Sequence, residues 1–190
     1  MDTLDKPSLP DPASTPNRHI ALRYGAIWAG VSIAITLVGF ITGNEPSMPD
    51  SSTAVKVGFW LIATAVSVWA IAGAIKEDRD KQLGGFITLG RGLGLGTLAA
   101  FISSALNAVF SILYMTVINP GFQDQMKEAM TAQYEKQGMS EEQIEMAIGF
   151  AEKFTSPGVM FVSALIMGTL IGAVISLIVA AIMKRDPFKA

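Results

Sequence analysis

The chain has 190 residues, of which 51% are hydrophobic and only 16% are charged, and its formal net charge is −2. Soluble domains carry about 25% charged residues, so the shortfall indicates long uncharged segments that reside in a bilayer. The near-neutral charge gives no indication of a nucleic-acid partner, and the absence of Cys excludes disulfides, thiolate metal sites and Cys nucleophiles. The single His19 precedes the first apolar segment and is interpreted as a solvated interfacial residue, because metal sites need three or four ligands.

Four segments lack charged side chains and are long enough to cross a hydrocarbon core of about 30 Å. They comprise residues 24–41, 57–75, 93–118 and 158–183. Backbone groups in lipid must be hydrogen-bonded within their own segment, so these segments are expected to be helices. We therefore predict an all-α polytopic membrane protein, with four transmembrane helices in one membrane domain over residues 18–190.

The tail and the distribution of basic residues predict the orientation. Residues 1–17 contain four Pro among Asp, Ser and Thr, a composition that cannot bury a core, and we expect a disordered tail. Ten of the 14 basic residues lie in residues 1–23, 76–92 and 184–190. Because cytoplasmic loops carry the excess of Lys and Arg, both termini are expected in the cytoplasm, with the chain in the bacterial inner membrane.

The connection over residues 119–157 is expected to be an extracytoplasmic helical hairpin. One apolar stripe recurs at every fourth residue, comprising Phe122, Met126, Met130 and Tyr134. Ser140, followed three residues later by Gln143, is typical of a capping box that starts a second helix. Seven acidic residues stand against three Lys, so we expect the apolar stripe to close within the hairpin and the acidic face to meet a basic or polar partner. The alternative is a solvated connector without a recognition role.

Small residues recur at every fourth position in three of the predicted spans. The third span carries Gly92, Gly96, Ala100, Ser104 and Ala108, the fourth carries Ala164, Gly168, Gly172, Ser176 and Ala180, and the first has the shorter row Ala26, Gly30 and Ala34. Such rows let helix backbones approach closely in lipid. We predict that spans three and four pack against each other or against other helices; a groove that admits a lipid or a partner helix is the alternative.

None of the four spans contains Asp, Glu, Lys, Arg or His, the residues on which proton relays and ion-coupled sites usually depend. Asn107, near the middle of the third span, is the most polar candidate, and we expect it to form an interhelical hydrogen bond rather than to bind a substrate. No nucleophile–base pair and no metal-ligand pattern is visible. The sequence thus predicts no catalytic, cofactor-binding or metal-binding residues and no enzymatic activity.

Two polar or glycine-rich stretches near the third span are interpreted as structural. Residues 85–92 have a glycine spacing like that of a phosphate-binding loop, but Arg91 and Gly92 stand where Lys and Ser or Thr are required, so no nucleotide partner is expected. We expect Gly84 and Gly85 to turn the chain and Ile87 to dip into the headgroups, with Phe86 and Leu89. The mixed charges of residues 76–81 are interpreted as a solvated surface.

Several stretches together resemble a known family. They are Tyr24-Gly25, the segment DKQLGGFITLG at 80–90, NPGF at 119–122 and GMSEEQIE at 138–145. On these motifs the chain resembles the domain of unknown function 4199 family of four-span bacterial membrane proteins, from about Arg18 to Arg185. The family often has Tyr where Phe86 stands and Lys where Arg91 stands. The resemblance implies the four-helix topology and supplies no catalytic residues.

Two functions remain from these observations. The leading hypothesis is a non-enzymatic scaffold or accessory subunit, which has the lipid bilayer and either further copies of itself or another membrane protein as partners. The alternative is a small oligomeric transporter or channel for an apolar or lipid-like substrate. The alternative requires a continuous polar path or cavity through the bundle, centred near Asn107.

Overall fold

The structure is a computed structural model that describes residues 15–49 and 51–185, and these residues form six α-helices and no strand. The helices are α1 (Arg18–Thr42), α2 (Thr53–Glu77), α3 (Leu89–Leu113), α4 (Phe122–Lys136), α5 (Glu141–Thr155) and α6 (Pro157–Met183). One π-helical turn, η1 (Asp78–Gln82), continues α2, and another, η2 (Tyr114–Ile118), continues α3. The predicted all-α class is confirmed. Residues 1–14 of the expected disordered tail lie outside the described residues.

Four helices are long and apolar enough to cross a membrane: Arg18–Thr42, Thr53–Gln82, Leu89–Ile118 and Pro157–Met183. Each begins earlier than its predicted apolar segment, or ends later, because hydropathy marks only the uncharged part of a helix while capping sets where it starts. The Ser52 side chain accepts from Val55 N and so starts α2, and Thr88 accepts from Arg91 N and starts α3. The polar flanks of the spans are therefore helical as well.

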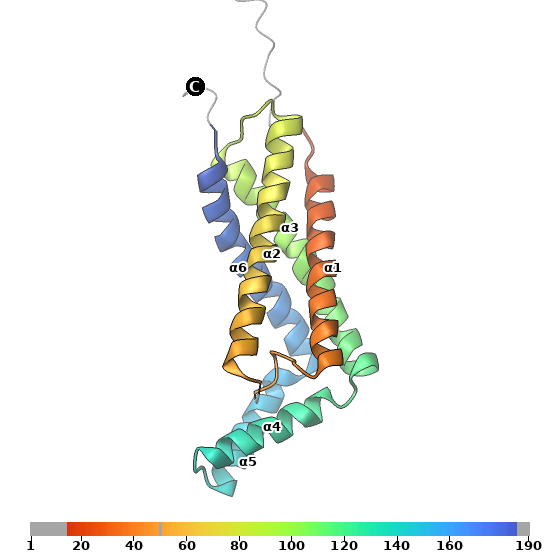
Figure 1. The fold of residues 1–190 in the computed structure, drawn as a ribbon, viewed down its shortest axis with the longest axis vertical. Coiled ribbons are helices and arrows are strands. Elements are labelled where there is room, and N and C mark those ends of the chain that lie inside the picture. The colour runs from red at the N-terminus through yellow and green to blue at the C-terminus, as the bar shows by residue number, and fades with distance from the viewer. Residues whose placement is uncertain (1–14, 50, 186–190) are drawn as a thin grey trace, which may run out of the picture.

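The four long helices lie side by side in a bundle, and α4 and α5 lie together beyond one end of it (Figure 1). The closest helix packing is between α3 and α6 and between α1 and α3, so α3 is the central helix. Both the start of α1 and the end of α6 lie at the opposite end from α4 and α5. We call this the termini end, and the other the α4–α5 end.

The contact between α3 and α6 is made by the two rows of small residues, in antiparallel register. A Cβ added to Gly92 would lie 3.0 Å from Ala180 Cβ, and one added to Gly96 would overlap the Ser176 hydroxyl. Further along the same contact, a Cβ on Gly172 would overlap Ala100 Cβ, and a Cβ on Gly168 would overlap the Ser104 hydroxyl. Each glycine on one helix therefore faces a larger residue on the other, so the two backbones approach as closely as glycine allows.

The row of small residues noted in the first span is not the one that packs in the bundle. Ala26, Gly30 and Ala34 are exposed on the outer face of α1, and nothing lies within 4 Å of a Cβ added to Gly30. A second row, one residue earlier, faces α3: Ala21, Gly25 and Ala29 are buried, and a Cβ on Gly25 would lie 2.7 Å from Ala99 O. Both rows have the same spacing, and only the position of α3 determines which of them is buried.

Helix α2 is packed over only part of its length. All of its buried residues lie in its second half, toward the termini end: Ser67, Ala70, Ile71, Ala74 and Ile75. The buried residues of α6 likewise lie in its second half, comprising Gly172, Ser176, Val179 and Ala180. The bundle is therefore tightly packed near the termini, and α2 and α6 are less closely packed nearer to the α4–α5 end.

Helices α4 and α5 form a pair that is anchored to the bundle by aromatic side chains. The Tyr114 ring, 5% exposed, lies 5.7 Å from the rings of both Phe40 and Phe122, so α1, η2 and α4 meet there. The predicted capping box of α5 is confirmed, since Ser140 N donates to Gln143 Oε1 at 3.0 Å and Gln143 N donates to the Ser140 hydroxyl at 3.4 Å.

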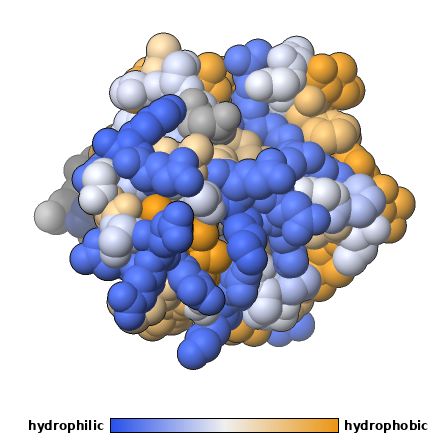
Figure 2. Space-filling model, turned by 90° about the horizontal axis from the view of Figure 1, so that it is seen from below, coloured by the Kyte–Doolittle hydropathy of each residue, from blue (hydrophilic) through white to orange (hydrophobic). Residues whose placement is uncertain are grey.

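The outer surface has the polarity of a membrane protein. Large apolar side chains are exposed along all four long helices, among them Ile41 at 79%, Trp60 at 65% and Ile182 at 77%. Exposure of this extent is unfavourable in water and favourable in hydrocarbon. Seen from the α4–α5 end, hydrophilic residues cover much of the surface, and hydrophobic residues lie between and around them (Figure 2).

The register of α3 and α6 predicts the effect of two matched substitutions. Gly172→Leu would force α6 away from Ala100, and we expect it to lower the stability of the bundle by about 1–3 kcal/mol or more. Gly94→Leu is the control, because nothing lies within 4 Å of a Cβ at Gly94 and Leu is favourable in lipid. Thermal unfolding in detergent measures both. Equal melting temperatures for the two variants would contradict this packing.

Candidate functional site

A crevice of about 320 Å³ lies where α2 and α6 are less closely packed. Its walls come from all four long helices: Trp28 of α1; Trp60, Ala63, Thr64 and Ser67 of α2; Ser103, Ser104 and Asn107 of α3; and Ala164, Gly168, Ile171, Gly172 and Ile175 of α6. The lining residues lie near the middle of the four long helices. A crevice therefore lies beside Asn107, but it is not the continuous path through the bundle that a transporter or channel requires.

The predicted packing residues divide into two groups. Gly168, Gly172 and Ser104 line the crevice, whereas Gly92, Gly96, Ala100 and Ser176 lie outside its lining, in the contact between α3 and α6. Ser176 is fully buried and donates its hydroxyl to Leu93 O at 3.1 Å, across the two helices. One row of small residues therefore serves both as a helix contact and, farther along, as a wall of the crevice.

Asn107 does not form the expected interhelical hydrogen bond among the described residues. Its Nδ2 donates to Ser103 O at 2.9 Å and lies 3.5 Å from the Ser103 hydroxyl, so both contacts stay within α3. The Asn107 amide is thereby held against its own helix. Asn107 lines the crevice, so its side chain meets open space rather than a neighbouring helix.

A second polar site lies at the termini end, where the Asp78 side chain is fully buried. Arg91 meets it side-on: Nε donates to Asp78 Oδ2 at 2.7 Å and Nη2 donates to Oδ1 at 2.8 Å. The guanidinium also donates from Nη2 to Thr15 O at 3.0 Å. This bidentate geometry is the strongest that an Arg–carboxylate pair adopts, and it joins η1 to the first turn of α3.

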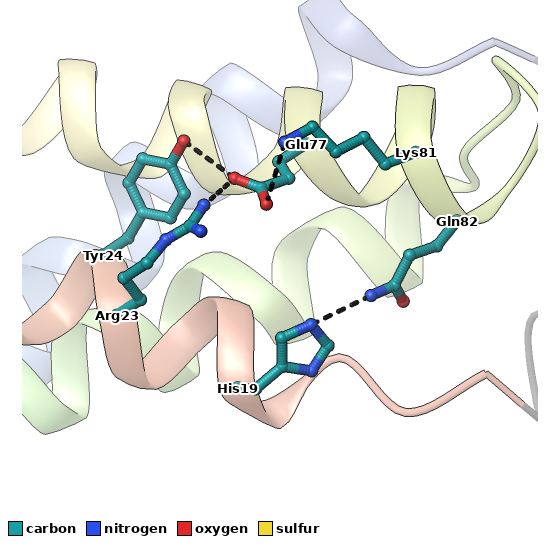
Figure 3. A network of polar contacts seen from close by, with 6 residues as sticks. All are labelled: His19, Arg23, Tyr24, Glu77, Lys81 and Gln82. Carbon is teal, nitrogen blue, oxygen red and sulfur yellow. Dashed lines mark hydrogen bonds and ion pairs between the residues drawn. The ribbon is translucent and has the colours of Figure 1, made fainter.

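Gln82 connects this ion pair to α1. Its amide lies 3.2 Å from His19 Nε2 (Figure 3). With the amide oxygen toward His19, the amide nitrogen donates to Asp78 Oδ1 and to Pro16 O, both at 3.2 Å. Beside it, the Glu77 carboxylate accepts hydrogen bonds from Arg23 and, at 3.2 Å, from the Tyr24 hydroxyl. Polar contacts therefore tie the start of α1 to the end of α2.

This site was not predicted from the sequence, and two expectations for its residues are wrong. Residues 76–81 are not simply a solvated surface, because Asp78 is 0% exposed. Ile87 does not dip into headgroups: it is 3% exposed and lies in a cluster with Leu83 and Val179. Ile87 also exchanges two backbone hydrogen bonds of 3.1 Å with Arg185, just beyond α6. Arg91 could have indicated this site from the sequence, because a charged residue at the start of an apolar helix requires a counter-charge.

Neither site has the composition of a metal centre or a nucleotide site. Within residues 15–49 and 51–185, no three His, Asp or Glu side chains are placed so that they could hold a metal ion. The crevice lining contains no ionisable residue, and the Asp78–Arg91 pair already satisfies its own charges. The structure thus contains a neutral, partly polar crevice within the bundle and a buried ion pair at its termini end.

The fold defines the chain as an all-α protein with four helices that are long and apolar enough to cross a membrane. The family model described as protein of unknown function (DUF4199) matches residues 23–185, which is most of the chain, and the protein therefore belongs to that family. No curated protein and no solved structure matches the chain. The family resemblance expected from the sequence is confirmed.

The buried ion pair predicts a large asymmetry between two charge deletions. Arg91→Ala leaves the Asp78 carboxylate buried without its counter-charge, and we expect a loss of about 3–5 kcal/mol of stability. Lys81→Ala is the control, because Lys81 is 72% exposed and its 3.5 Å pair with Glu77 is worth less than about 1 kcal/mol. Thermal unfolding in detergent compares them. If Arg91→Ala were as stable as Lys81→Ala, the pair would not hold η1 to α3.

Proposed function

We propose that this protein is a non-enzymatic scaffold or accessory subunit of the bacterial inner membrane, with both termini in the cytoplasm and the α4–α5 pair outside. The orientation rests on the ten basic residues of 14 that lie in residues 1–23, 76–92 and 184–190. With the α4–α5 pair at the opposite end of the bundle, this orientation makes the pair the largest element available to a partner outside the cytoplasm.

The observation that carries the proposal is an apolar stripe on the outer face of α5. Met146, Phe150 and Phe154 follow one another at every fourth residue and are 63%, 65% and 57% exposed. The Phe150 and Phe154 ring centroids lie 4.9 Å apart, so the two rings form one continuous surface. Aromatic and Met side chains are enriched at protein–protein contacts. The inward face of α5 is separate and already occupied, because Ile144 and Ile148 are buried.

The charges around the stripe select the chemistry of the partner. Helices α4 and α5 carry seven acidic residues and three Lys, and one of those Lys, Lys127, is paired with Glu152 at 2.9 Å. That hydrogen bond raises the pKa of Lys127. An acidic surface disfavours anionic headgroups and a second copy of itself. The partner that fits is another polypeptide, with apolar side chains for the stripe and basic residues for its surroundings.

The crevice is the one observation that favours the alternative function of a transporter or channel. Toward the termini end, beyond Ser67, the interior is filled by Ile71, Ile75 and Leu95, which are at most 2% exposed. A continuous polar path would have to pass these aliphatic side chains. The accessory role therefore requires less rearrangement of the described structure than conduction does.

The proposed partner contact can be tested by a photo-crosslinking amino acid placed at Phe150 in the full-length protein in native membranes. We expect a discrete protein adduct, because the stripe would face a polypeptide. The same amino acid at Glu128, an exposed position of α4, is the control and should give a weaker adduct or none. Adducts with lipid alone at position 150 would assign the stripe to the membrane surface and refute the partner contact.

The proposed orientation can be tested with single Cys residues, because the native chain contains none. A Cys at position 137, between α4 and α5, should react with a membrane-impermeant maleimide while the inner membrane is intact. A Cys at position 81, at the termini end, should react only after that membrane is opened. The reverse pattern would overturn the orientation.

A further inference from the structure

We propose that the crevice lined by Thr64, Ser104 and Asn107 is a binding site for an uncharged, lipid-like alcohol: a hydrocarbon chain or ring system with one hydroxyl group. This inference goes beyond the accessory role, since it concerns a ligand held within the bundle rather than a partner outside it. It rests on the position of the crevice, the charge of its walls and the hydrogen-bonding capacity of its polar atoms.

The crevice opens on the lipid-facing surface of the bundle. Two of its lining residues, Trp60 and Ile171, are 65% and 56% exposed, so the opening lies on the apolar outer surface between α2 and α6. On the inner side, Trp28 reaches across from α1, and its ring lies 3.7 Å from a Cβ added to Gly172. A molecule can therefore enter sideways from the bilayer without passing through water.

The walls accept only an uncharged ligand. All lining residues of the crevice are aliphatic, aromatic, glycine, hydroxyl or amide residues. A phosphate or carboxylate group at this depth would lose its hydration without a counter-charge, at a large cost in free energy. Phospholipid and fatty-acid headgroups are therefore unsuited to this site, whereas a hydroxyl group needs only one or two hydrogen bonds.

Three polar atoms of the lining are available for those bonds. Among the described residues, Thr64 Oγ1, Ser104 Oγ and Asn107 Oδ1 make no hydrogen bond to the protein. Several other hydroxyls in the spans are bonded within their own helix; for example, Thr169 donates to Leu165 O at 2.6 Å. In hydrocarbon an unmade hydrogen bond is costly, so these three atoms mark a place where a polar group of a ligand is stabilised.

The pattern of donors and acceptors favours an alcohol over a ketone or an ester. Asn107 Oδ1 can only accept a hydrogen bond, and it therefore needs a donor from the ligand. The Thr64 and Ser104 hydroxyls can donate to a ligand oxygen. A ligand hydroxyl meets both requirements, whereas a carbonyl oxygen leaves Asn107 Oδ1 unsatisfied. With a volume of about 320 Å³, the crevice holds the polar group and the adjoining carbons, and the remaining chain extends into lipid.

The test uses full-length protein in phosphatidylcholine nanodiscs and two photoreactive probes. The first is a long-chain alcohol with a diazirine close to the hydroxyl, and the second is the corresponding hydrocarbon without the hydroxyl. Peptide mapping after illumination locates the adducts. We expect the alcohol to label residues that line the crevice, and the hydrocarbon to label the outer surfaces of all four long helices without this preference.

Variants that keep the shape of the crevice test the polar atoms. Thr64→Val and Asn107→Leu should each lower labelling of the crevice by the alcohol about two- to ten-fold, the effect of one hydrogen bond. Thr169→Val is the matched control, because the Thr169 hydroxyl is bonded within α6 and outside the crevice lining; labelling should be unchanged. Ala63→Phe, which fills the crevice from α2, should abolish it.

Each other outcome would overturn the proposal. Equal labelling of the crevice by alcohol and hydrocarbon would mean that an acyl chain fills it without hydrogen bonding. Wild-type labelling in Ala63→Phe would mean that the crevice is not the site. Thermal unfolding of each variant separates loss of binding from loss of fold. Because no partner is present in the nanodiscs, these results are independent of the proposed accessory role.

Discussion

The close approach of α3 and α6 is the constraint on which the rest of the bundle depends. Helices in lipid gain no hydrophobic free energy from meeting each other, so a contact must arise from shape and hydrogen bonding. Along this contact the glycine lies on α3 at Gly92 and Gly96, and on α6 at Gly172 and Gly168. The larger residue that faces each glycine is therefore on α6 in one half of the contact and on α3 in the other half. Each glycine faces a larger residue only when the two helices run antiparallel, so this reciprocity favours the antiparallel register.

That constraint also explains why the bundle is tighter at one end. At the termini end, the side-on Asp78–Arg91 pair joins η1 to α3, and backbone hydrogen bonds between Ile87 and Arg185 join the segment before α3 to the end of α6. A buried ion pair adds little net stability over an apolar pair, but it tolerates few geometries. It therefore fixes η1 against α3 in one position. Toward the α4–α5 end, no ion pair of this kind holds the described part of α2 against α3. The looser packing there leaves room for the crevice.

The sequence predicted the elements well and the tertiary contacts only in part. The rows in the third and fourth spans could be recognised from spacing alone, because every fourth residue is small, but spacing could not choose between a mutual contact and a contact with other helices. In α1 two rows have equal spacing, and spacing cannot tell the buried row from the exposed one. Asp78 was hidden in a run of mixed charges that is typical of surfaces. Its burial depends on Arg91, 13 residues away, and on the fold that brings them together.

The two proposed binding surfaces are connected through α6. Helix α5 ends at Thr155 and α6 begins at Pro157, so a force on the α5 stripe reaches α6 through a single intervening residue, Ser156. The described first half of α6 has no buried residue, and it includes Ala164 and Gly168 of the crevice lining. A partner on α5 would therefore act next to the half of α6 that has no buried residue. The width of the crevice, rather than the well-packed termini end, is the feature of the bundle that such a contact is best placed to change.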